Sequence, residues 1–241
     1  FDGMKNINSK IKRSMATYIQ GDIHEVILSL EDNSIDLIYT DPPFGTTRAK
    51  WDEPLEWDYM FAEMWRVLKP QGKIILYASL PFTYELLKYD KPKYHYSWHK
   101  NNSTNFFMAK KQPLRCMEEI FVYYQKPGTY NPQMTGLQKF KKRVVTYGGK
   151  HDYYGTQNKK PNEYIGEDGH VGTYPTTYKN WKVRKDDSGI TRGDEQIDYF
   201  IKTYSNEGDV VLDMTCHNNY VGDRCLLLDR EYIGVDKDLQ C

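Results

Sequence analysis

The chain has 241 residues and a formal net charge of zero, with 39% apolar and 15% aromatic residues. This composition excludes disordered and fibrous proteins, and the length suits one large domain or a domain with an insertion. No stretch of about 18 apolar residues and no signal-peptide pattern occurs, so we expect a soluble, intracellular (cytoplasmic) protein without a membrane partner. The four cysteines form no C-x-x-C pair, which predicts free thiols. His95 and His99 have the spacing of metal ligands on a helix, but no Cys or acid cluster completes a site, so we expect no metal.

The zero net charge hides a basic segment in the middle of the chain. Residues 91–160 carry 14 Lys and Arg against 3 Asp and Glu, with tyrosines interleaved among them. Such a stretch favours a groove that follows phosphates and stacks bases. A solvated, tyrosine-rich surface is the alternative that composition alone leaves open.

The first half of the chain alternates between strand and helix patterns. A short strand ends at Gly21 and Asp22, a helix follows, and the apolar residues 35–40 predict a buried strand. Pro54 opens a helix whose apolar residues recur at helical spacing up to Leu68, and residues 69–72 end it. The strand at residues 73–79 comes next.

The same alternation returns near residues 120–125 and again after residue 191. Residues 126–191 show no sustained period, and a region that long inside a domain is either functional or disordered. Downstream, helical and strand patterns alternate again as far as Asp236. We therefore predict one α/β domain over residues 1–241, with a mostly parallel sheet, helices on both faces and an inserted region at 126–191.

Three acids follow predicted strands: Asp41, Asp213 and Asp236. In open α/β sheets ligands bind at the carboxyl ends of the strands, and an acid about 20 residues after the first turn often holds a nucleotide ribose. The turn after Asp213 is poor in glycine, so we expect Asn218 and Asn219 to supply its positive φ values. An ordinary loop without a ligand is the alternative.

Asp41, Pro42, Pro43 and Phe44 form the motif with the clearest chemistry. The two prolines fix φ and lack N–H donors, so the turn presents carbonyl oxygens beside the Asp41 carboxylate. Acceptors without donors suit an exocyclic amino group. Hydrogen bonds from its two hydrogens to Asp41 and the Pro42 carbonyl would localise its lone pair for attack on an electrophile, while Phe44 stacks on the ring. A proline-rich turn that caps a strand is the structural alternative.

Four stretches resemble the amino-methylating DNA methyltransferases of the permuted β group: GDIHEVILSLEDNSIDLIYTDPPFG, MWRVLKPQGKIILYAS, FFMAKKQPLRCMEEIFVYYQKPGTYNPQMTG and IKTYSNEGDVVLDMTC. In that group the catalytic motif precedes the cofactor motif, as here. The resemblance implies a Rossmann-like methyltransferase fold, S-adenosylmethionine as donor, and a flipped base in double-stranded DNA as acceptor. It also implies a restriction-modification setting, and we expect the inserted region at 126–191 to recognise the DNA.

An acid first and an aromatic last in the catalytic tetrapeptide imply adenine N6 as the methylated atom. N4-cytosine methylation and a catalytically inactive DNA-binding partner subunit are the alternatives, and a homodimer is one assembly the family allows. By position, the resemblance assigns catalysis to Asp41, Pro42, Pro43 and Phe44. It assigns cofactor binding to a second set: Asp22, Arg192, Asp213, Thr215, His217, Asn219 and Asp236.

Three basic residues, Lys110, Lys111 and Arg115, are the candidates for contacts with DNA phosphates, a solvated basic turn being the alternative. Two stretches depart from the family pattern. Residues 215–219 stand where the family has Phe-x-Gly-x-Gly, which bears on cofactor affinity. SGITRG stands where the family has His-Pro-Thr-Gln-Lys-Pro, so only the basic Arg192 remains in register.

Overall fold

The computed structural model describes residues 15–139, 150–151, 155–156, 170–186 and 189–239. The chain divides into two compact units, one of Phe1–Asn131 with Thr177–Cys241 and the other of Pro132–Thr176. The smaller unit contains two short antiparallel ribbons: β6 (Thr135–Lys139) pairs with β9 (His170–Thr173), and β7 (Lys150–His151) pairs with β8 (Gly155–Thr156). It falls inside residues 126–191, whose role in recognition stays a prediction.

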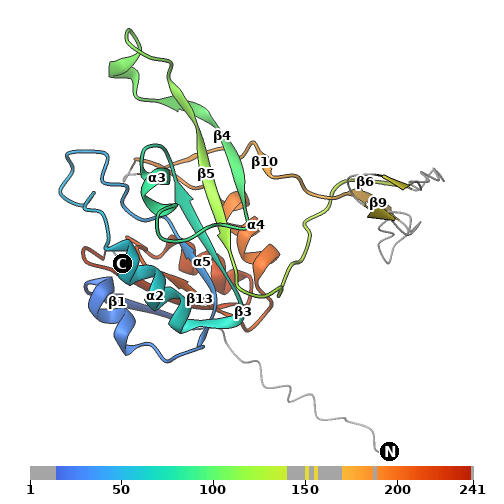
Figure 1. Ribbon diagram of the computed structural model, residues 1–241, viewed down its shortest axis with the longest axis horizontal. Coiled ribbons are helices and arrows are strands. Elements are labelled where there is room, and N and C mark those ends of the chain that lie inside the picture. Colours follow the sequence, from blue (N-terminus) through green and yellow to red (C-terminus); the bar gives the residue numbers. More distant parts are fainter. Residues whose placement is uncertain (1–14, 140–149, 152–154, 157–169, 187–188, 240–241) are drawn as a thin grey trace, which may run out of the picture. The chain divides into compact units, whose positions relative to one another are not determined.

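The larger unit is built on an eight-stranded sheet in the order β1-β14-β13-β2-β3-β5-β4-β10 (Figure 1). The strands are β1 (Ala16–Gln20), β2 (Ile35–Thr40), β3 (Leu68–Ala78), β4 (Tyr94–Thr104), β5 (Arg115–Tyr123), β10 (Tyr178–Lys179), β13 (Val210–Asp213) and β14 (Glu231–Asp236). The five strands from β1 to β3 in this order are parallel, whereas β5 is antiparallel to both β3 and β4. A separate ribbon pairs β11 (Arg184–Asp186) with β12 (Gly189–Thr191).

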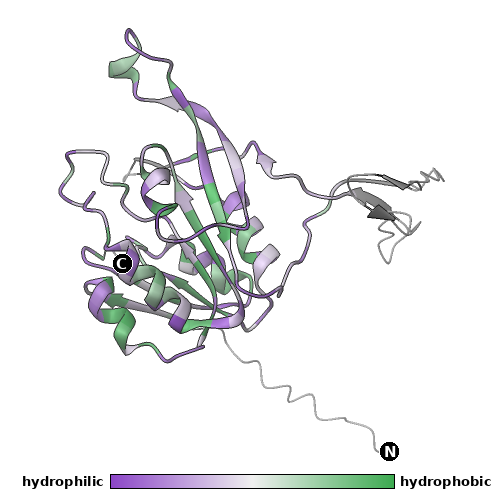
Figure 2. Cartoon of the chain, in the orientation of Figure 1, coloured by the Kyte–Doolittle hydropathy of each residue, from purple (hydrophilic) through white to green (hydrophobic). Residues whose placement is uncertain are grey.

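Helices cover both faces of this sheet. One face carries α1 (Ile23–Val26), the 3-10 helix η1 (Ile27–Ser29), α2 (Trp57–Val67) and α3 (Phe82–Leu86), and the other carries α4 (Asp194–Tyr204) and α5 (Tyr220–Leu227). Successive strand residues point to opposite faces, so Ile74 belongs to the core under α2 and Ile75 to the core under α4. Figure 2 shows these hydrophobic strands inside a more polar surface. The predicted α/β fold is confirmed.

The boundary between α2 and β3 differs from the prediction. The helix ends at Val67 and the strand begins at Leu68, so residues 69–72 belong to the strand instead of ending the helix. Gly72 permits the close approach of β2 and β3, because a Cβ at this position would lie 2.8 Å from the carbonyl oxygen of Asp36. The pairing of β2 with β3 is irregular here, between Ile35 and Leu37.

The strand β4 was not predicted. It pairs with β5 from Tyr94 to Thr104, and the connection between the two strands contains the 3-10 helix η2 (Phe106–Met108). We call residues 100–115 the arm, because this end of the hairpin projects beyond the helices of the larger unit (Figure 1). Within the described ranges, no helix combines the length and the apolar character needed to cross a bilayer.

The core under α4 depends on aromatic packing around Phe200. This residue is 0% exposed, and its ring contacts those of Tyr39, Tyr77, Tyr96 and Trp181 at centroid distances of 5.2–6.3 Å. Replacing Phe200 with Ala should therefore lower the free energy of unfolding by about 3–5 kcal/mol. Leu227→Ala is the control, because Leu227 is 70% exposed. Urea denaturation of both variants measures the difference, and equal small effects would contradict the packing described.

Candidate active site

The predicted catalytic turn begins at the carboxyl end of β2. Thr40, the last residue of the strand, is fully buried, and Asp41 follows it. Pro42 is buried, whereas Phe44 is half-buried. The Phe44 ring stacks on Phe82 of α3, with the ring centroids 5.0 Å apart and the planes inclined by 18°. The core thus fixes the orientation of the aromatic ring that follows the two prolines.

The loop after this turn is closed by Asp52. The backbone N–H groups of Gly45, Thr46 and Thr47 donate to its carboxylate at 2.8, 2.9 and 2.6 Å. Burial raises the pKa of Asp52, but these bonds and one from the Thr47 side chain together lower it. Gly45 has a φ of 63°, which glycine adopts readily. Motif reasoning missed Asp52, whose only sign in the sequence is an acid a few residues after Gly-Thr-Thr.

The Asp41 carboxylate belongs to a cluster of four charged side chains. Arg192 Nη2 lies 2.7 Å from Asp41 Oδ2 and 3.0 Å from Glu118 Oε2. Lys100 Nζ donates to Glu118 Oε1 at 2.6 Å. Sequence reasoning missed Glu118 and Lys100, and it assigned Arg192 to the cofactor. The ion pairs of Arg192 with Asp41 and Glu118 place it beside the predicted catalytic turn, and its contact with the cofactor stays a prediction.

Burial and charge act in opposite directions on the acids of this cluster. Desolvation raises the pKa of Asp41; Arg192 lowers it and Glu118 raises it, and the net effect is an increase. Desolvation also raises the pKa of Glu118, but Arg192 and Lys100 together bring it below its ordinary value. Glu118 is therefore a permanent negative charge near neutral pH, and Asp41 is the acid that gains a proton more readily.

A second group of predicted residues lies at the end of β13. Asp213 is 4% exposed and accepts hydrogen bonds from the Thr215 N–H at 3.2 Å and the Tyr232 hydroxyl at 3.4 Å. Burial raises the pKa of Asp213 to about 7, although the hydrogen bond from the Thr215 N–H lowers it. The hydroxyls of Thr40 and Thr215 are 3.1 Å apart. This contact joins the turn after β2 to the turn after β13.

The predicted acids Asp236 and Asp22 lie at the carboxyl ends of the neighbouring strands β14 and β1: Asp236 ends β14, and Asp22 follows β1. The Asp236 carboxylate accepts from the N–H groups of His217 and Asp238, both at 2.8 Å. Asp22 caps α1 through the His24 N–H at 3.0 Å, and Lys237 Nζ lies 3.1 Å from its other oxygen. Burial raises the pKa of Asp22. The hydrogen bonds from His24 and Lys237 outweigh burial and lower the pKa to about 2. Both acids lie at the same edge of the sheet as Asp213.

The turn after Asp213 replaces glycine in an unexpected way. His217 has a φ of 56°, whereas Asn219 has a φ of −79° and Asn218 is not among the described residues with positive φ. The expectation that the two asparagines supply the left-handed conformation was wrong. Asn219 instead precedes α5, and its carbonyl accepts a hydrogen bond from the Tyr18 hydroxyl at 3.2 Å. The Asp236 bond to the His217 N–H holds the histidine backbone in this strained conformation.

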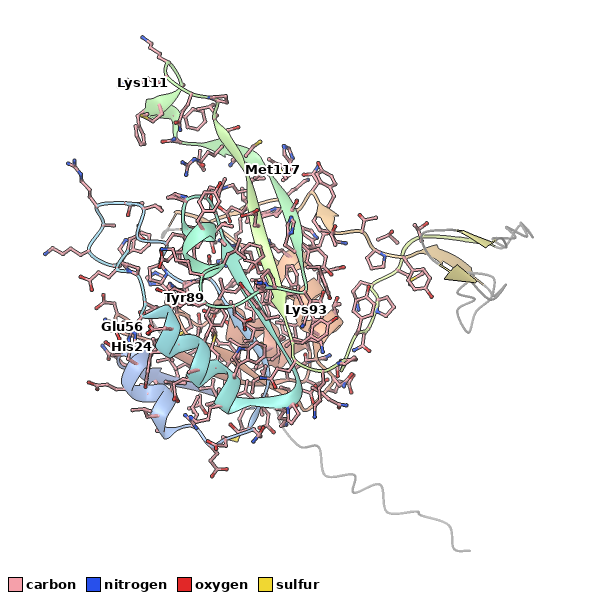
Figure 3. All side chains as sticks on the ribbon, viewed as in Figure 1. His24, Glu56, Tyr89, Lys93, Lys111 and Met117 are labelled. Carbon is pink, nitrogen blue, oxygen red and sulfur yellow. The ribbon has the colours of Figure 1, made fainter. Side chains whose placement is uncertain are left out.

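The predicted DNA-binding residues lie on the arm. Lys110, Lys111 and Arg115 are all exposed, and Lys111 stands at the far end of the hairpin (Figure 3). Phe106 and Phe107 at the same end are 67% and 88% exposed. The described residues hold no group of three His, Cys, Asp or Glu placed to bind a metal.

Comparison with known proteins identifies the family. Residues 35–241 match the N6/N4 family described as DNA methylase. The chain belongs to the DNA methylase family. It is 26% identical to the type II methyltransferase M.BamHI of Bacillus amyloliquefaciens over 98% of its own length, and it spans 58% of that protein. It is also 26% identical to the DNA adenine methyltransferase YhdJ of Escherichia coli K12, over 91% of this chain and 78% of YhdJ.

Solved structures show that this DNA methylase has the methyltransferase fold. The M1.HpyAVI–SAM complex matches 92% of each chain, with 17% identity and a TM-score of 0.53. The cytosine-N4-specific PvuII DNA methyltransferase matches 92% of this chain and 82% of its own, with 14% identity and a TM-score of 0.59. The fold expected from the resemblance is confirmed.

The raised pKa of Asp213 predicts a pH-dependent stability of this chain. Between pH 4 and pH 7 the unfolded chain ionises Asp213, whose ordinary pKa is 3.8, while the folded chain keeps it protonated up to about pH 7. The free energy of unfolding should therefore fall as the pH rises through this window. Asp213→Asn removes this contribution, so the variant should gain about 3 kcal/mol relative to wild type between pH 5 and pH 8. A pH-independent difference in urea denaturation would show that Asp213 titrates normally.

Proposed function

We propose that this protein is a site-specific DNA methyltransferase that transfers a methyl group from S-adenosylmethionine to the N6 amino group of a flipped adenine. The observation that carries the proposal is the position of the turn from Asp41 to Phe44, at the carboxyl edge of the sheet and 3.1 Å from the Asp213 turn through the Thr40 and Thr215 hydroxyls. The catalytic turn precedes the Asp213 turn in the chain, which is the order of motifs in the permuted β group.

The acids at this edge fit S-adenosylmethionine. The donor has an α-ammonium group, a sulfonium and ribose hydroxyls, and Asp22, Asp213 and Asp236 are acceptors for such groups. A bound cation would stabilise the ionised form of Asp213, whose burial otherwise favours the protonated acid. Asp236 already accepts two backbone bonds, and each carboxylate oxygen retains a second lone pair for a hydroxyl. Thr215, His217 and Asn219 form the turn beside these acids. When bound, the cofactor supplies an electrophilic methyl group.

The residues of the catalytic turn act on the acceptor base. The Asp41 carboxylate and the Pro42 carbonyl accept hydrogen bonds from the amino group, which directs the nitrogen lone pair towards the methyl group. Pro43 keeps this part of the turn rigid and free of N–H donors, and Phe44 stacks on the base. Desolvation of this partly exposed carboxylate and the nearby Glu118 raise the pKa of Asp41, which makes it a better acceptor for the proton that the nitrogen releases. The Thr40–Thr215 contact supports the alignment that in-line displacement requires.

Adenine is the preferred acceptor because the tetrapeptide begins with an acid and ends with an aromatic residue. The similarity to YhdJ, which is named a DNA adenine methyltransferase, supports the same choice. N4-cytosine methylation is the second candidate, since a cytosine-N4-specific enzyme shares the fold. The region at 126–191 is our candidate for DNA recognition in either case.

Incubation with S-adenosylmethionine and DNA of mixed sequence separates these functions. We expect N6-methyladenine when the digested nucleosides are analysed by mass spectrometry, and N4-methylcytosine would contradict the choice of base. Asp41→Asn should reduce the rate by about 100-fold or more, because an amide is a weaker acceptor than a carboxylate. Asp58→Asn, an exposed acid of α2, is the control and should retain the wild-type rate. Calorimetry that detects DNA binding but no S-adenosylmethionine binding would favour the inactive partner subunit instead.

The arm is our candidate for contact with the DNA backbone. Lys110, Lys111 and Arg115 are exposed, and the arm contains no acidic side chain. Lys110→Ala with Lys111→Ala should therefore weaken DNA binding for all sequences and reduce the slope of log K against log salt by about 0.9 per lost phosphate contact. Lys91→Ala with Lys93→Ala is the matched control, because these exposed lysines lie near the opposite end of β4 (Figure 3). Equal losses in the two double variants would contradict a specific role for the arm.

A further inference from the structure

We propose that Arg192, Glu118 and Lys100 form a buried charge cluster that positions the Asp41 carboxylate for the acceptor amino group. This inference rests on the proposed methyl transfer and assigns Arg192 to the acceptor side of the site. None of the three residues needs to contact substrate, so each would be a positioning residue.

The burial of the cluster decreases towards the catalytic turn. The side chains of Lys100, Glu118 and Arg192 are 8%, 11% and 15% exposed, whereas that of Asp41 is 39% exposed. Lys100 pairs with Glu118, Glu118 with Arg192, and Arg192 with Asp41, at 2.6, 3.0 and 2.7 Å. A mostly buried chain of charges therefore ends at Asp41, the most exposed of the four side chains.

The Arg192 guanidinium is also held by aromatic rings. Its central carbon lies 4.5 Å from the ring centroid of Tyr77 and 5.0 Å from that of Trp98. Tyr77 is on β3, Trp98 on β4, Glu118 on β5 and Asp41 directly after β2, so four neighbouring strands meet at one cation. The ion pair joins Arg192 Nη2 to Asp41 Oδ2 at 2.7 Å. It orients the carboxylate at the exposed end of the cluster, where the acceptor amino group would bind.

Stability alone gives no reason for this arrangement. Removing charges from water is costly, and well-packed apolar side chains often replace buried ion clusters without loss. The cluster is also incompletely satisfied, because the buried Arg192 Nε has no hydrogen-bond partner in the described part of the chain. Apolar side chains in place of the cluster could fill the same space, but they would neither orient the Asp41 carboxylate nor stabilise its charge.

The cluster predicts opposite effects of its two central residues on the protonation of Asp41. The charged and titratable groups that face Asp41 are Arg192, Glu118, Lys100, Tyr39, Tyr77 and Asp213. Arg192 and Lys100 favour the carboxylate, while Glu118 opposes it. Tyr39 and Tyr77 have strongly raised pKa values and stay neutral. Loss of Arg192 should raise the pKa of Asp41, and loss of Glu118 should lower it.

The pH dependence of kcat for DNA methylation tests this inference. Arg192→Met should lower kcat and move the acid limb of the profile upward by roughly 1–3 pH units, with KM for DNA changed less. Glu118→Gln should move the same limb downward. Arg192→Lys keeps the charge but not the planar fork, so its acid limb should lie near the wild-type position although its kcat falls.

Arg66→Met is the matched control, because Arg66 also pairs with two carboxylates, those of Asp32 and Glu63, beside the opposite end of β2. It should leave the acid limb unchanged. Thermal unfolding of each variant identifies any that fail to fold. If Arg192→Met does not fold, Glu118→Gln still tests the inference, because it retains the Arg192–Asp41 pair. If the wild type is active, the inference would be overturned by acid limbs that move in the same direction in Arg192→Met and Glu118→Gln, or that do not move at all. A wild type that methylates no DNA would instead contradict the proposed function.

Discussion

The ion pair between Arg192 and Asp41 is the interaction on which the proposed site depends. Asp41 and Glu118 place two carboxylates in the same partly dehydrated region, and without a cation between them their repulsion would favour protonation of Asp41. Arg192 compensates both charges and is itself held over Tyr77 and Trp98. The acceptor that the proposed chemistry needs, an ionised and oriented carboxylate beside two prolines, therefore depends on a residue that is remote from Asp41 in the chain.

The parallel sheet explains why these groups meet. Strands β1, β14, β13 and β2 are neighbours, and their carboxyl ends bring Asp22, Asp236, Asp213 and Asp41 to one edge. The Thr40–Thr215 contact ties the catalytic turn to the turn proposed for the cofactor. The antiparallel strands β5 and β4 then add Glu118 and Lys100 from the other side of β3. One sheet thus supplies both halves of the proposed site, and β4 and β5 continue into the basic arm.

The strands with strong local patterns were predictable, and so was the position of the turn after β2. Residues 35–40 are apolar except for Asp36 and Thr40, α2 has apolar residues at helical spacing, and the acids at the ends of β2, β13 and β14 follow from the predicted strand ends. The charge cluster was not predictable, because Arg192 meets Asp41 and Glu118 only through the order of strands in the sheet. Local preference was also misleading at residues 215–219, where tertiary contacts put the positive φ on His217 instead of an asparagine. In β4 the alternation of buried Tyr96, Trp98 and Lys100 was present but masked by polar neighbours.

Direct titration of the Asp41 carboxyl carbon by 13C NMR tests the central claim most directly, with Asp41→Asn used to assign the resonance. The account predicts that Asp41 titrates above its ordinary value of 3.8 in the wild-type protein and higher still in Arg192→Met. An ordinary pKa in both proteins would contradict it, because Asp41 would then be a solvated surface acid that Arg192 neither positions nor keeps ionised.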